Sequence, residues 1–339
     1  MIPKLYYRVV VLLTMALLVG CGPEPLIVIS GNTMGTTYSV KVIGAHEDMA
    51  ELQRAVQDSV DRIDQLMSNY KSDSELSRLN RSELLSAFTL SDETTAVLKL
   101  SADIHGLSMG AFDISLAPVV DLWGFGPDPT ISEVPPPEAI AKALSSTGMD
   151  GLKLDGNSAT RLRDVTFNLS AIAKGYAVDR VAAMLEARGY QHFLVEVGGE
   201  LKARGTNRAG ERWRIAIELP DASKREMFSV IQLENLGMAT SGDYRNYFEV
   251  DGKRYSHTIN PKTGKPITHN LASVTVLDPS TARADGLATA INVMGAERGL
   301  ALANTHKIPI MVIMKQAEGF VAETSVAFDE YLSKLENSR

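Results

Sequence analysis

Asp285 and Thr289 lie four residues apart in a segment whose composition predicts a helix. On a helix, residues i and i+4 share one face, so this carboxylate and this hydroxyl would point in the same direction. Hard cations such as Mg²⁺ take oxygen ligands of this kind and keep open positions for water or a substrate phosphate. An acidic residue that complements the helix dipole, beside a packed threonine, is the simpler alternative. Taken alone, the pair is explained better by that alternative, so the candidate metal site depends on what surrounds it.

The segment Asn168–Gly175 predicts the start of a helix that runs to Arg188, with Gly189 ending it. Ser170 is a suitable N-cap, which would leave the first backbone N–H groups of the helix available to an anion such as phosphate. Lys174 follows one turn later, where its ammonium group could reach the same phosphate. The alternative is an ordinary capped helix with a solvated lysine.

His257 follows a predicted hairpin strand and precedes the turn-rich segment Thr258–Gly264. Because histidine titrates near neutral pH, it can accept a proton from an attacking hydroxyl group. His257 is therefore a candidate general base. The alternative is a structural histidine that serves only hydrogen bonding.

Three further segments combine glycine with small polar residues: Thr33–Thr36, Gly110–Asp113 and Thr240–Arg245. Glycine allows the backbone to approach a ligand closely. Side chains with the size and shape to sandwich a planar ring are Met34, Tyr70, Phe112 and Trp123. The sequence contains no GxGxxG, Walker, G-x-S-x-G or HExxH motif, which excludes the commonest nucleotide-binding and hydrolase signatures.

The elements that must position these residues alternate between helices and hairpin-linked strands. Apolar residues at helical spacing predict a helix over residues 48–68, and Ser91 is the predicted N-cap of a second helix. Residues 27–42 indicate two strands, and the dipeptide Asp251-Gly252 predicts a hairpin turn. Further strands are predicted at residues 193–197, 213–219, 272–277 and 308–314, and helices at residues 284–303.

This mixture favours an α+β fold with largely antiparallel sheets and packed helices over a doubly wound parallel sheet. Residues 127–137 carry five prolines and form the clearest internal boundary, yet it is too weak to separate two domains. We therefore expect a single catalytic domain of two lobes over residues 27–335.

The first 20 residues have the pattern of a bacterial lipoprotein signal. Lys4 and Arg8 precede an apolar run, which ends just before Cys21, the single cysteine of the chain. We expect cleavage before Cys21, lipid attachment to it, and a short tether over residues 21–26. The alternative is an ordinary signal peptide with an incidental cysteine. The run is shorter than the roughly 20 apolar residues that a transmembrane helix needs.

The remaining bulk properties exclude some partners. The formal net charge is −7, or about −9 without the two leader cations, and no block of Lys and Arg occurs. Nucleic acid is therefore not an expected partner. No second cysteine is present to form a disulfide bond or a thiolate metal site, so any metal would be a hard ion such as Mg²⁺ or Mn²⁺.

Read together and in order, these motifs resemble the ApbE family of flavin-transferring lipoproteins, the FAD:protein FMN transferases. The resemblance extends from Thr33 to Pro309. The segments that carry it are Thr33–Tyr38, Tyr70–Asn80, Gly110–Gly126, Asn168–Asp179, Val197–Leu201, Thr240–Asn246, Ser256–Pro261 and Ala284–Thr289.

The resemblance implies particular roles for particular residues. FAD, as the substrate, would bind between the lobes through Met34, Tyr70, Ala111, Phe112, Asp113, Asn168, Lys174 and Ile259. Mg²⁺, with Mn²⁺ as a possible substitute, would be held by Asp285, Thr289 and the backbone carbonyl of Ala171, and would bridge the pyrophosphate. His257 matches the position of the suspected base.

The resemblance also implies a reaction and a place for it. The FMN part of FAD would pass to a Thr or Ser hydroxyl of an acceptor protein, releasing AMP. The acceptor would carry a D-x-x-[ST]-G-A-T-like motif and belong to a membrane electron-transfer complex. The enzyme would be lipid-anchored on the periplasmic side of a bacterial membrane. Two alternatives stay open: a Mg²⁺-dependent FAD pyrophosphatase, and a lipoprotein that only binds FAD.

Overall fold

The structure is a computed structural model that describes residues 24–44, 48–127, 133–221, 224, 226–242 and 247–337. The predicted leader and residues 21–23 of the tether, which include Cys21, lie outside the described residues, as does the segment 243–246. Among the described helices, none is both long and apolar enough to cross a membrane.

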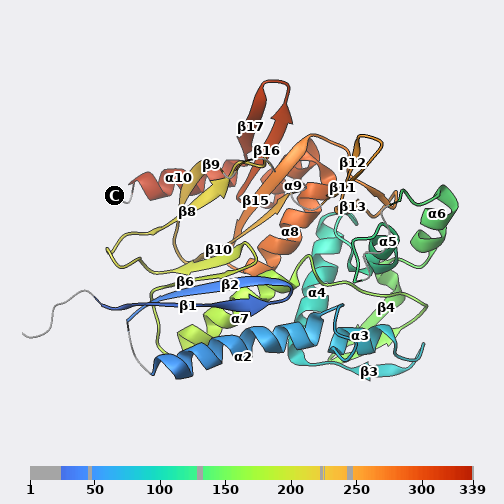
Figure 1. The fold of residues 1–339 in the computed structure, drawn as a ribbon, viewed down its shortest axis with the longest axis horizontal. Coiled ribbons are helices and arrows are strands. Elements are labelled where there is room, and N and C mark those ends of the chain that lie inside the picture. Colours follow the sequence, from blue (N-terminus) through green and yellow to red (C-terminus); the bar gives the residue numbers. More distant parts are fainter. Residues whose placement is uncertain are drawn as a thin grey trace, which may run out of the picture.

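A central sheet of eight antiparallel strands organises the molecule (Figure 1). Its order is β1-β2-β6-β7-β10-β15-β16-β17, and three of its seven neighbouring pairs, β1-β2, β6-β7 and β16-β17, are joined by short hairpins. The strands are β1 (Leu26–Thr33), β2 (Thr36–Ile43), β6 (Phe193–Val197), β7 (Glu200–Arg204), β10 (Leu236–Gly242), β15 (Leu271–Asp278), β16 (Ile310–Gln316) and β17 (Gly319–Thr324). All eight residues of β15 are buried, because both faces of the sheet are covered at its centre.

Helices cover one face of this sheet and enclose the main core. They are α2 (Met49–Met67), α4 (Asp92–Leu107), α7 (Ala173–Ala187), α8 (Thr281–Met294) and α9 (Ala296–His306). On α2 the buried residues are Leu52, Val56, Val60, Ile63 and Met67, which recur at the spacing of one helix face. Burial of this stripe explains why the sequence pattern located α2 correctly.

The opposite face of the sheet is covered by the hairpin β8 (Trp213–Glu218) and β9 (Met227–Leu233) together with α10 (Val326–Asn337). β8 alternates buried and exposed residues along its whole length, as a strand with one covered face must. Figure 1 shows these elements at the left, on the side of the molecule away from the shorter helices.

The smaller lobe is built around a separate apolar cluster. It contains α5 (Ala117–Leu122), α6 (Pro137–Ser145), and the hairpins β11 (Tyr247–Val250) with β12 (Lys253–Ser256) and β13 (Ile259–Asn260) with β14 (Lys265–Pro266). Trp123 anchors the lobe: its indole N–H donates to the Gly264 carbonyl at 2.7 Å. The remaining elements are α3 (Glu75–Asn80), the short sheet β3 (Ala87–Thr89), β5 (Ser158–Arg161) and β4 (Leu152–Asp155), and the 3₁₀ turns Ile114–Leu116 and Met149–Gly151.

Most predicted elements are confirmed, including the α+β class and the hairpin at Asp251-Gly252. Ser91 caps α4 by accepting from the Thr94 N–H. The predicted helical segment 284–303 differs in detail. It begins earlier, at Thr281, and divides into α8 and α9 at Gly295, whose φ of 82° a helix does not allow.

Candidate active site around helix α8

Helix α8 carries three polar residues on one face: Asp285, Thr289 and Asn292. Their spacing of four and then three residues stacks them along the helix. Asp285 is 3% exposed and Asn292 is 1% exposed. The Thr289 hydroxyl lies 3.3 Å from the Ser241 hydroxyl at the end of β10. The predicted pairing of Asp285 and Thr289 on one helix face is confirmed.

Helix α7 approaches α8 closely at Gly175. The Gly175 N–H donates to Asp285 Oδ2 at 3.0 Å. A Cβ atom on residue 175 would lie 2.4 Å from the Thr281 carbonyl oxygen and 2.8 Å from Asp285 Cβ, so only glycine fits between the helices. In a regular helix the Gly175 N–H would instead donate to the carbonyl of Ala171. Among the described residues, no backbone N–H donates to that carbonyl.

The start of α7 differs from the prediction. Ser170 does not cap the helix, which begins at Ala173 with Ile172 in the cap position and no side-chain cap. The Asn168 side chain is the reason, because its Oδ1 accepts from the Ser170 N–H at 2.8 Å and holds residue 170 in a turn. The predicted Ser170 cap is therefore wrong, and phosphate binding at this end of the helix stays a prediction.

Two buried carboxylates and the partly exposed Lys174 ammonium meet at the junction of α7, β7 and α8. Lys174 Nζ is 3.1 Å from Glu200 Oε1 and 4.0 Å from Asp285 Oδ1. Glu200 is brought there by a two-residue turn between β6 and β7, in which Gly198 and Gly199 both have positive φ. Gly198 also lies against the Lys174 stem, since a Cβ there would be 3.0 Å from Lys174 Cδ.

Burial and mutual charge shift the pKa of all three groups. Burial, reinforced by the charge of Asp285, raises the pKa of Glu200 to about 8, although Lys174 opposes this. Burial likewise raises the pKa of Asp285. Burial alone would lower the pKa of Lys174, but the carboxylates of Asp285 and Glu200 outweigh it and raise that pKa. The cluster holds two acids and one base, and the raised pKa of each acid means that burial favours its neutral form until a further positive charge is present.

The donors near Asp285 fit a hard cation. They are all oxygens: a buried carboxylate, the Thr289 hydroxyl one turn away, and the Ala171 carbonyl that Gly175 leaves without its usual donor. In the described part of the chain, no three His, Cys, Asp or Glu side chains gather into a metal-binding group. Mg²⁺ commonly uses one or two carboxylates together with substrate phosphates. The residues present therefore fit Mg²⁺ accompanied by a phosphate better than Mg²⁺ alone.

His257 lies directly after β12 and is half-buried. Its ring meets that of Phe125 edge-on, with centroids 6.2 Å apart. The next residue, Thr258, ties this segment to α8, because its hydroxyl accepts from Asn292 Nδ2 at 3.3 Å. His257 therefore comes from a segment attached to the helix that carries Asp285, about two turns further along.

The residues predicted to contact FAD come from several elements. Met34 lies in the β1–β2 turn with φ of 51°, beside a pocket of about 430 Å³ lined by that turn and by Asp61 and Asp64. Tyr70 is 68% exposed. Ile259 is buried in the smaller lobe. Met34 and Tyr70 are accessible enough to meet a planar ring.

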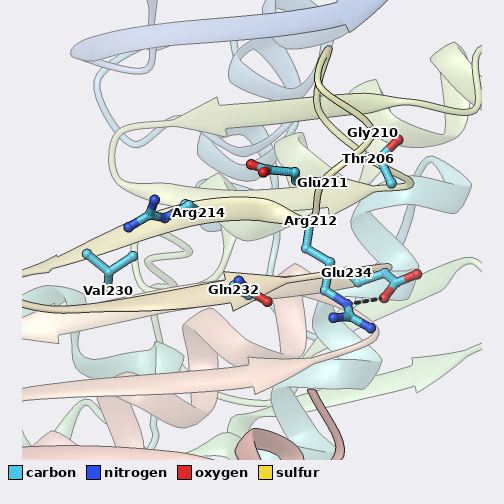
Figure 2. A pocket seen from close by; sticks show the side chains of 8 residues that line it. All are labelled: Thr206, Gly210, Glu211, Arg212, Arg214, Val230, Gln232 and Glu234. Atoms are coloured by element: carbon cyan, nitrogen blue, oxygen red, sulfur yellow. Dashed lines mark hydrogen bonds and ion pairs between the residues drawn. The ribbon is translucent and has the colours of Figure 1, made fainter. Parts of the chain in front are cut away.

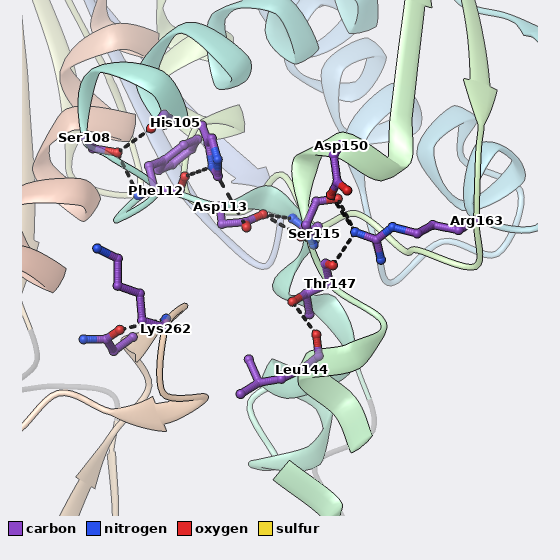
Figure 3. Close-up of polar contacts among 12 residues, drawn as sticks. His105, Ser108, Phe112, Asp113, Ser115, Leu144, Thr147, Asp150, Arg163 and Lys262 are labelled. Atoms are coloured by element: carbon purple, nitrogen blue, oxygen red, sulfur yellow. Dashed lines mark hydrogen bonds and ion pairs between the residues drawn. The ribbon is translucent and has the colours of Figure 1, made fainter. Parts of the chain in front are cut away.

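The segment that contains Ala111, Phe112 and Asp113 is fixed by its own hydrogen bonds (Figure 3). His105 Nδ1 lies 2.8 Å from the Phe112 carbonyl oxygen, and Asp113 Oδ1 accepts from the N–H and the hydroxyl of Ser115. The rings of Phe112 and Trp123 are each only 2% exposed. Both pack against protein, so the prediction that they sandwich a planar ligand is wrong.

Asn168 lies beside this segment, since its N–H donates to the Ile114 carbonyl at 2.7 Å. A Cβ on Gly286 of α8 would lie 3.5 Å from Phe112 Cζ and 3.6 Å from Ile172 Cδ1. The 111–113 segment, the 168–175 segment and α8 therefore meet at one place. The structure therefore brings these three segments into contact, which is the arrangement that a shared site requires.

A larger pocket of about 710 Å³ lies elsewhere, on the outer side of β8 and β9 (Figure 2). It contains none of the predicted site residues, and the Arg212 guanidinium on its wall is paired with Glu234 at 2.8 Å. Volume alone would select this pocket. The buried charges and open oxygen donors select α8 instead.

Sequence reasoning missed three residues of the site region: Glu200, Asn292 and Asp179. The Asp179 carboxylate on α7 accepts from the Thr281 and Ala282 N–H groups at 3.0 and 3.1 Å, so it caps α8 from another helix. Glu200 lies within the motif Val197–Leu201, and its position directly after two glycines could have identified it. Asn292 extends the i, i+4 pattern by one turn and could have been found by continuing it.

The arrangement defines an α+β protein in which an acid and a hydroxyl on one helix, and a backbone carbonyl just before another, are suited to chemistry at a phosphate. Comparison with known proteins agrees. The ApbE family model matches residues 34–314. The chain is 43% identical to the FAD:protein FMN transferase of Vibrio cholerae over 329 residues, covering 96% of this chain and 98% of that one. It is 37% identical to the Salmonella typhimurium protein of that name, covering 98% and 99%.

Solved structures give the same result. The flavin transferase ApbE from Vibrio cholerae superposes with a TM-score of 0.85 at 41% identity, covering 91% of this chain and 99% of that one. The apo form of the Pseudomonas stutzeri flavinyl transferase ApbE gives 0.86 at 40% identity, covering 92% and 98%. The chain belongs to the ApbE family.

Proposed function

We propose that this protein transfers the FMN part of FAD to a Thr or Ser hydroxyl of an acceptor protein, with release of AMP, in a reaction that requires Mg²⁺ or Mn²⁺. The observation that carries the proposal is the buried Asp285 carboxylate, which takes the Gly175 N–H that a regular helix would give to the Ala171 carbonyl, with Thr289 one turn away. Membership of a family whose relatives are named FAD:protein FMN transferase supports the substrate.

The reaction exchanges one phosphorus–oxygen bond for another. The acceptor oxygen forms a bond to the FMN phosphorus, and the bond from that phosphorus to the bridging oxygen breaks, so that AMP leaves with the bridging oxygen. The hydroxyl proton must go to a base, and His257 is the candidate because its segment is attached to α8 through Thr258 and Asn292. Lys174 supplies positive charge beside the leaving phosphate.

Asp285, Thr289 and the Ala171 carbonyl would hold the cation. When bound, Mg²⁺ neutralises charge on the diphosphate as the leaving group departs. The Gly175 N–H fixes one oxygen of the Asp285 carboxylate, which leaves the other oxygen directed away from that bond. The Met34 turn and Tyr70 supply accessible surface for the flavin ring.

The acceptor and the location belong to the same proposal. We expect an acceptor with a D-x-x-[ST]-G-A-T-like motif in a membrane electron-transfer complex. The sequence up to Cys21 supports lipid anchoring on the periplasmic side of a bacterial membrane.

The test is incubation of the protein with FAD, Mg²⁺ and an acceptor carrying this motif. The expected result is an acceptor whose mass rises by one FMN, with one AMP released for each modified acceptor. Asp285→Asn should abolish the transfer, and His257→Ala should slow it while FAD still binds.

Two other outcomes would point to different functions. Steady release of AMP and free FMN without any acceptor would show a pyrophosphatase that uses water. FAD recovered unchanged after long incubation with acceptor and Mg²⁺ would show a protein that only binds the flavin. Unaltered turnover of His257→Ala would remove the histidine from the proton transfer.

A further inference from the structure

Glu200 is a buried carboxylate whose main polar contact is with Lys174. Its side chain is 6% exposed, and Lys174 is the one cation within 4.0 Å of it among the described residues. Glu200 Oε2 has no hydrogen-bond partner in the described part of the protein. A buried ion pair with an unsatisfied oxygen is a poor source of stability, because desolvation offsets most of the attraction. Its position calls for another explanation.

The Lys174 ammonium lies between two carboxylates and is closer to one of them than to the other. It is at ion-pair distance from Glu200, 3.1 Å, while its distance to Asp285 Oδ1 is 4.0 Å, beyond a hydrogen bond. Asp285 satisfies its other oxygen with the Gly175 N–H. A side chain at position 198 would crowd the Lys174 stem, since a Cβ there would lie 3.0 Å from Lys174 Cδ, so glycine leaves room for this stem. As a result Asp285 Oδ1 is not occupied by the nearest cationic side chain.

We infer that Glu200 is a positioning residue that holds Lys174 away from Asp285 and so keeps Asp285 Oδ1 open to a divalent cation. The inference rests on the proposed function, because it takes Asp285 as the cation ligand. Without Glu200, the ammonium would move the remaining distance to Asp285 and compete with the cation for that oxygen. Glu200 itself does not contact the cation.

The experiment measures Mn²⁺ affinity by electron paramagnetic resonance, with the protein saturated by FAD and saturation checked by flavin fluorescence. Glu200→Asp keeps the negative charge but withdraws it by one methylene, which weakens its hold on Lys174 at the present 3.1 Å contact. Glu200→Gln keeps the reach and loses the charge. We expect both variants to bind Mn²⁺ roughly 10-fold to 100-fold more weakly than the wild type, the range typical of residues that orient metal ligands.

The decisive comparison is the double variant Glu200→Asp, Lys174→Met. Because Lys174 itself belongs to the proposed FAD site, the reference is the single variant Lys174→Met at its own saturating FAD concentration. Removal of the competing ammonium should restore the Mn²⁺ affinity of the double variant to that of Lys174→Met. If Glu200 contributed only its charge, Glu200→Asp would bind Mn²⁺ as the wild type does, and that result overturns the inference. Failure of the double variant to recover affinity overturns it as well.

A separate variant distinguishes this inference from the proposed function. Asp285→Asn should lose Mn²⁺ binding in the same assay. If Asp285→Asn binds Mn²⁺ normally, the proposed metal site is wrong and the inference falls with it. If Asp285→Asn loses binding while Glu200→Asp and Glu200→Gln keep it, only the role of Glu200 is wrong. Circular dichroism of each variant confirms that it is folded, and Glu200→Gln, being almost the same size, guards against failure of Glu200→Asp to fold.

Discussion

Replacing Gly175 with alanine would place a methyl group between α7 and α8. The new Cβ would lie 2.4 Å from the Thr281 carbonyl oxygen, whereas ordinary contacts begin at 3.4 Å, so the helices would have to separate by about 1 Å. That displacement would stretch the bond from the Gly175 N–H to Asp285 Oδ2, now 3.0 Å, out of hydrogen-bonding range. The substitution should therefore damage both stability and the metal site.

The magnitude follows from three contributions. Loss of a hydrogen bond to a charged group costs about 1.5–3 kcal/mol, and forcing a methyl group into a packed contact costs about 1–3 kcal/mol. The higher helix propensity of alanine offsets about 0.5–1 kcal/mol of this destabilisation. We expect Gly175→Ala to lower the free energy of unfolding by roughly 2–5 kcal/mol, as the balance of these terms.

Gly106→Ala is a matched control. Gly106 also lies in a helix, α4, but a Cβ there would meet no atom within 4 Å. This change should be neutral or stabilising by up to about 1 kcal/mol. Urea denaturation followed by circular dichroism compares the two variants, and Mn²⁺ titration in the presence of FAD reports on Asp285. If Gly175→Ala unfolds at the same urea concentration as the wild type and binds Mn²⁺ equally well, the argument from close helix approach is refuted.

Three other predictions concern residues that the site depends on. Asp179→Ala removes the acceptor of the Thr281 and Ala282 N–H groups, while the Ser280 N-cap of α8 stays. It should lower the free energy of unfolding by about 2–3 kcal/mol, measured by urea denaturation; an unchanged midpoint would contradict this role of Asp179. Burial raises the pKa of Glu200 from its usual 4.5 to about 8, so the folded protein binds more protons than the unfolded chain between these values. In the metal-free protein this contribution to stability is fully present below pH 4.5 and is lost as the pH rises to about 8. The free energy of unfolding of the wild type minus that of Glu200→Gln should therefore fall over this interval. Asn292→Ala releases Thr258, next to the candidate base, and should slow FMN transfer roughly 10-fold to 100-fold while FAD affinity, measured by fluorescence titration, stays unchanged; equal losses in both would indicate general disruption.

Local interactions explain what could be predicted from the sequence alone. The stripe on α2, the Ser91 cap and the Asp251-Gly252 turn each depend on residues within a few positions of one another. The spacing of Asp285 and Thr289 fixed their common face in the same way. The order of several motifs together indicated the family, which the comparisons confirm.

The failures have equally local causes. Ser170 has the composition of a cap, yet the Asn168 side chain captures its N–H first and delays the helix to Ala173. The rings of Phe112 and Trp123 have the size to stack on a ligand, but packing buries both. In each case the residue type allowed the predicted role, but contacts with neighbouring atoms prevented it.

Only the tertiary structure decided which distant groups share the centre. Gly175 and Asp285 are 110 positions apart, and Asp179 caps a helix that begins about 100 residues later. The pairing of Lys174 with Glu200 depends on the fold of a glycine turn against the start of α7. No spacing rule reaches across such distances, because these contacts are set by how helices and sheet pack once the apolar faces are buried. The sequence therefore determined the elements and the donor types, and packing determined which charges meet.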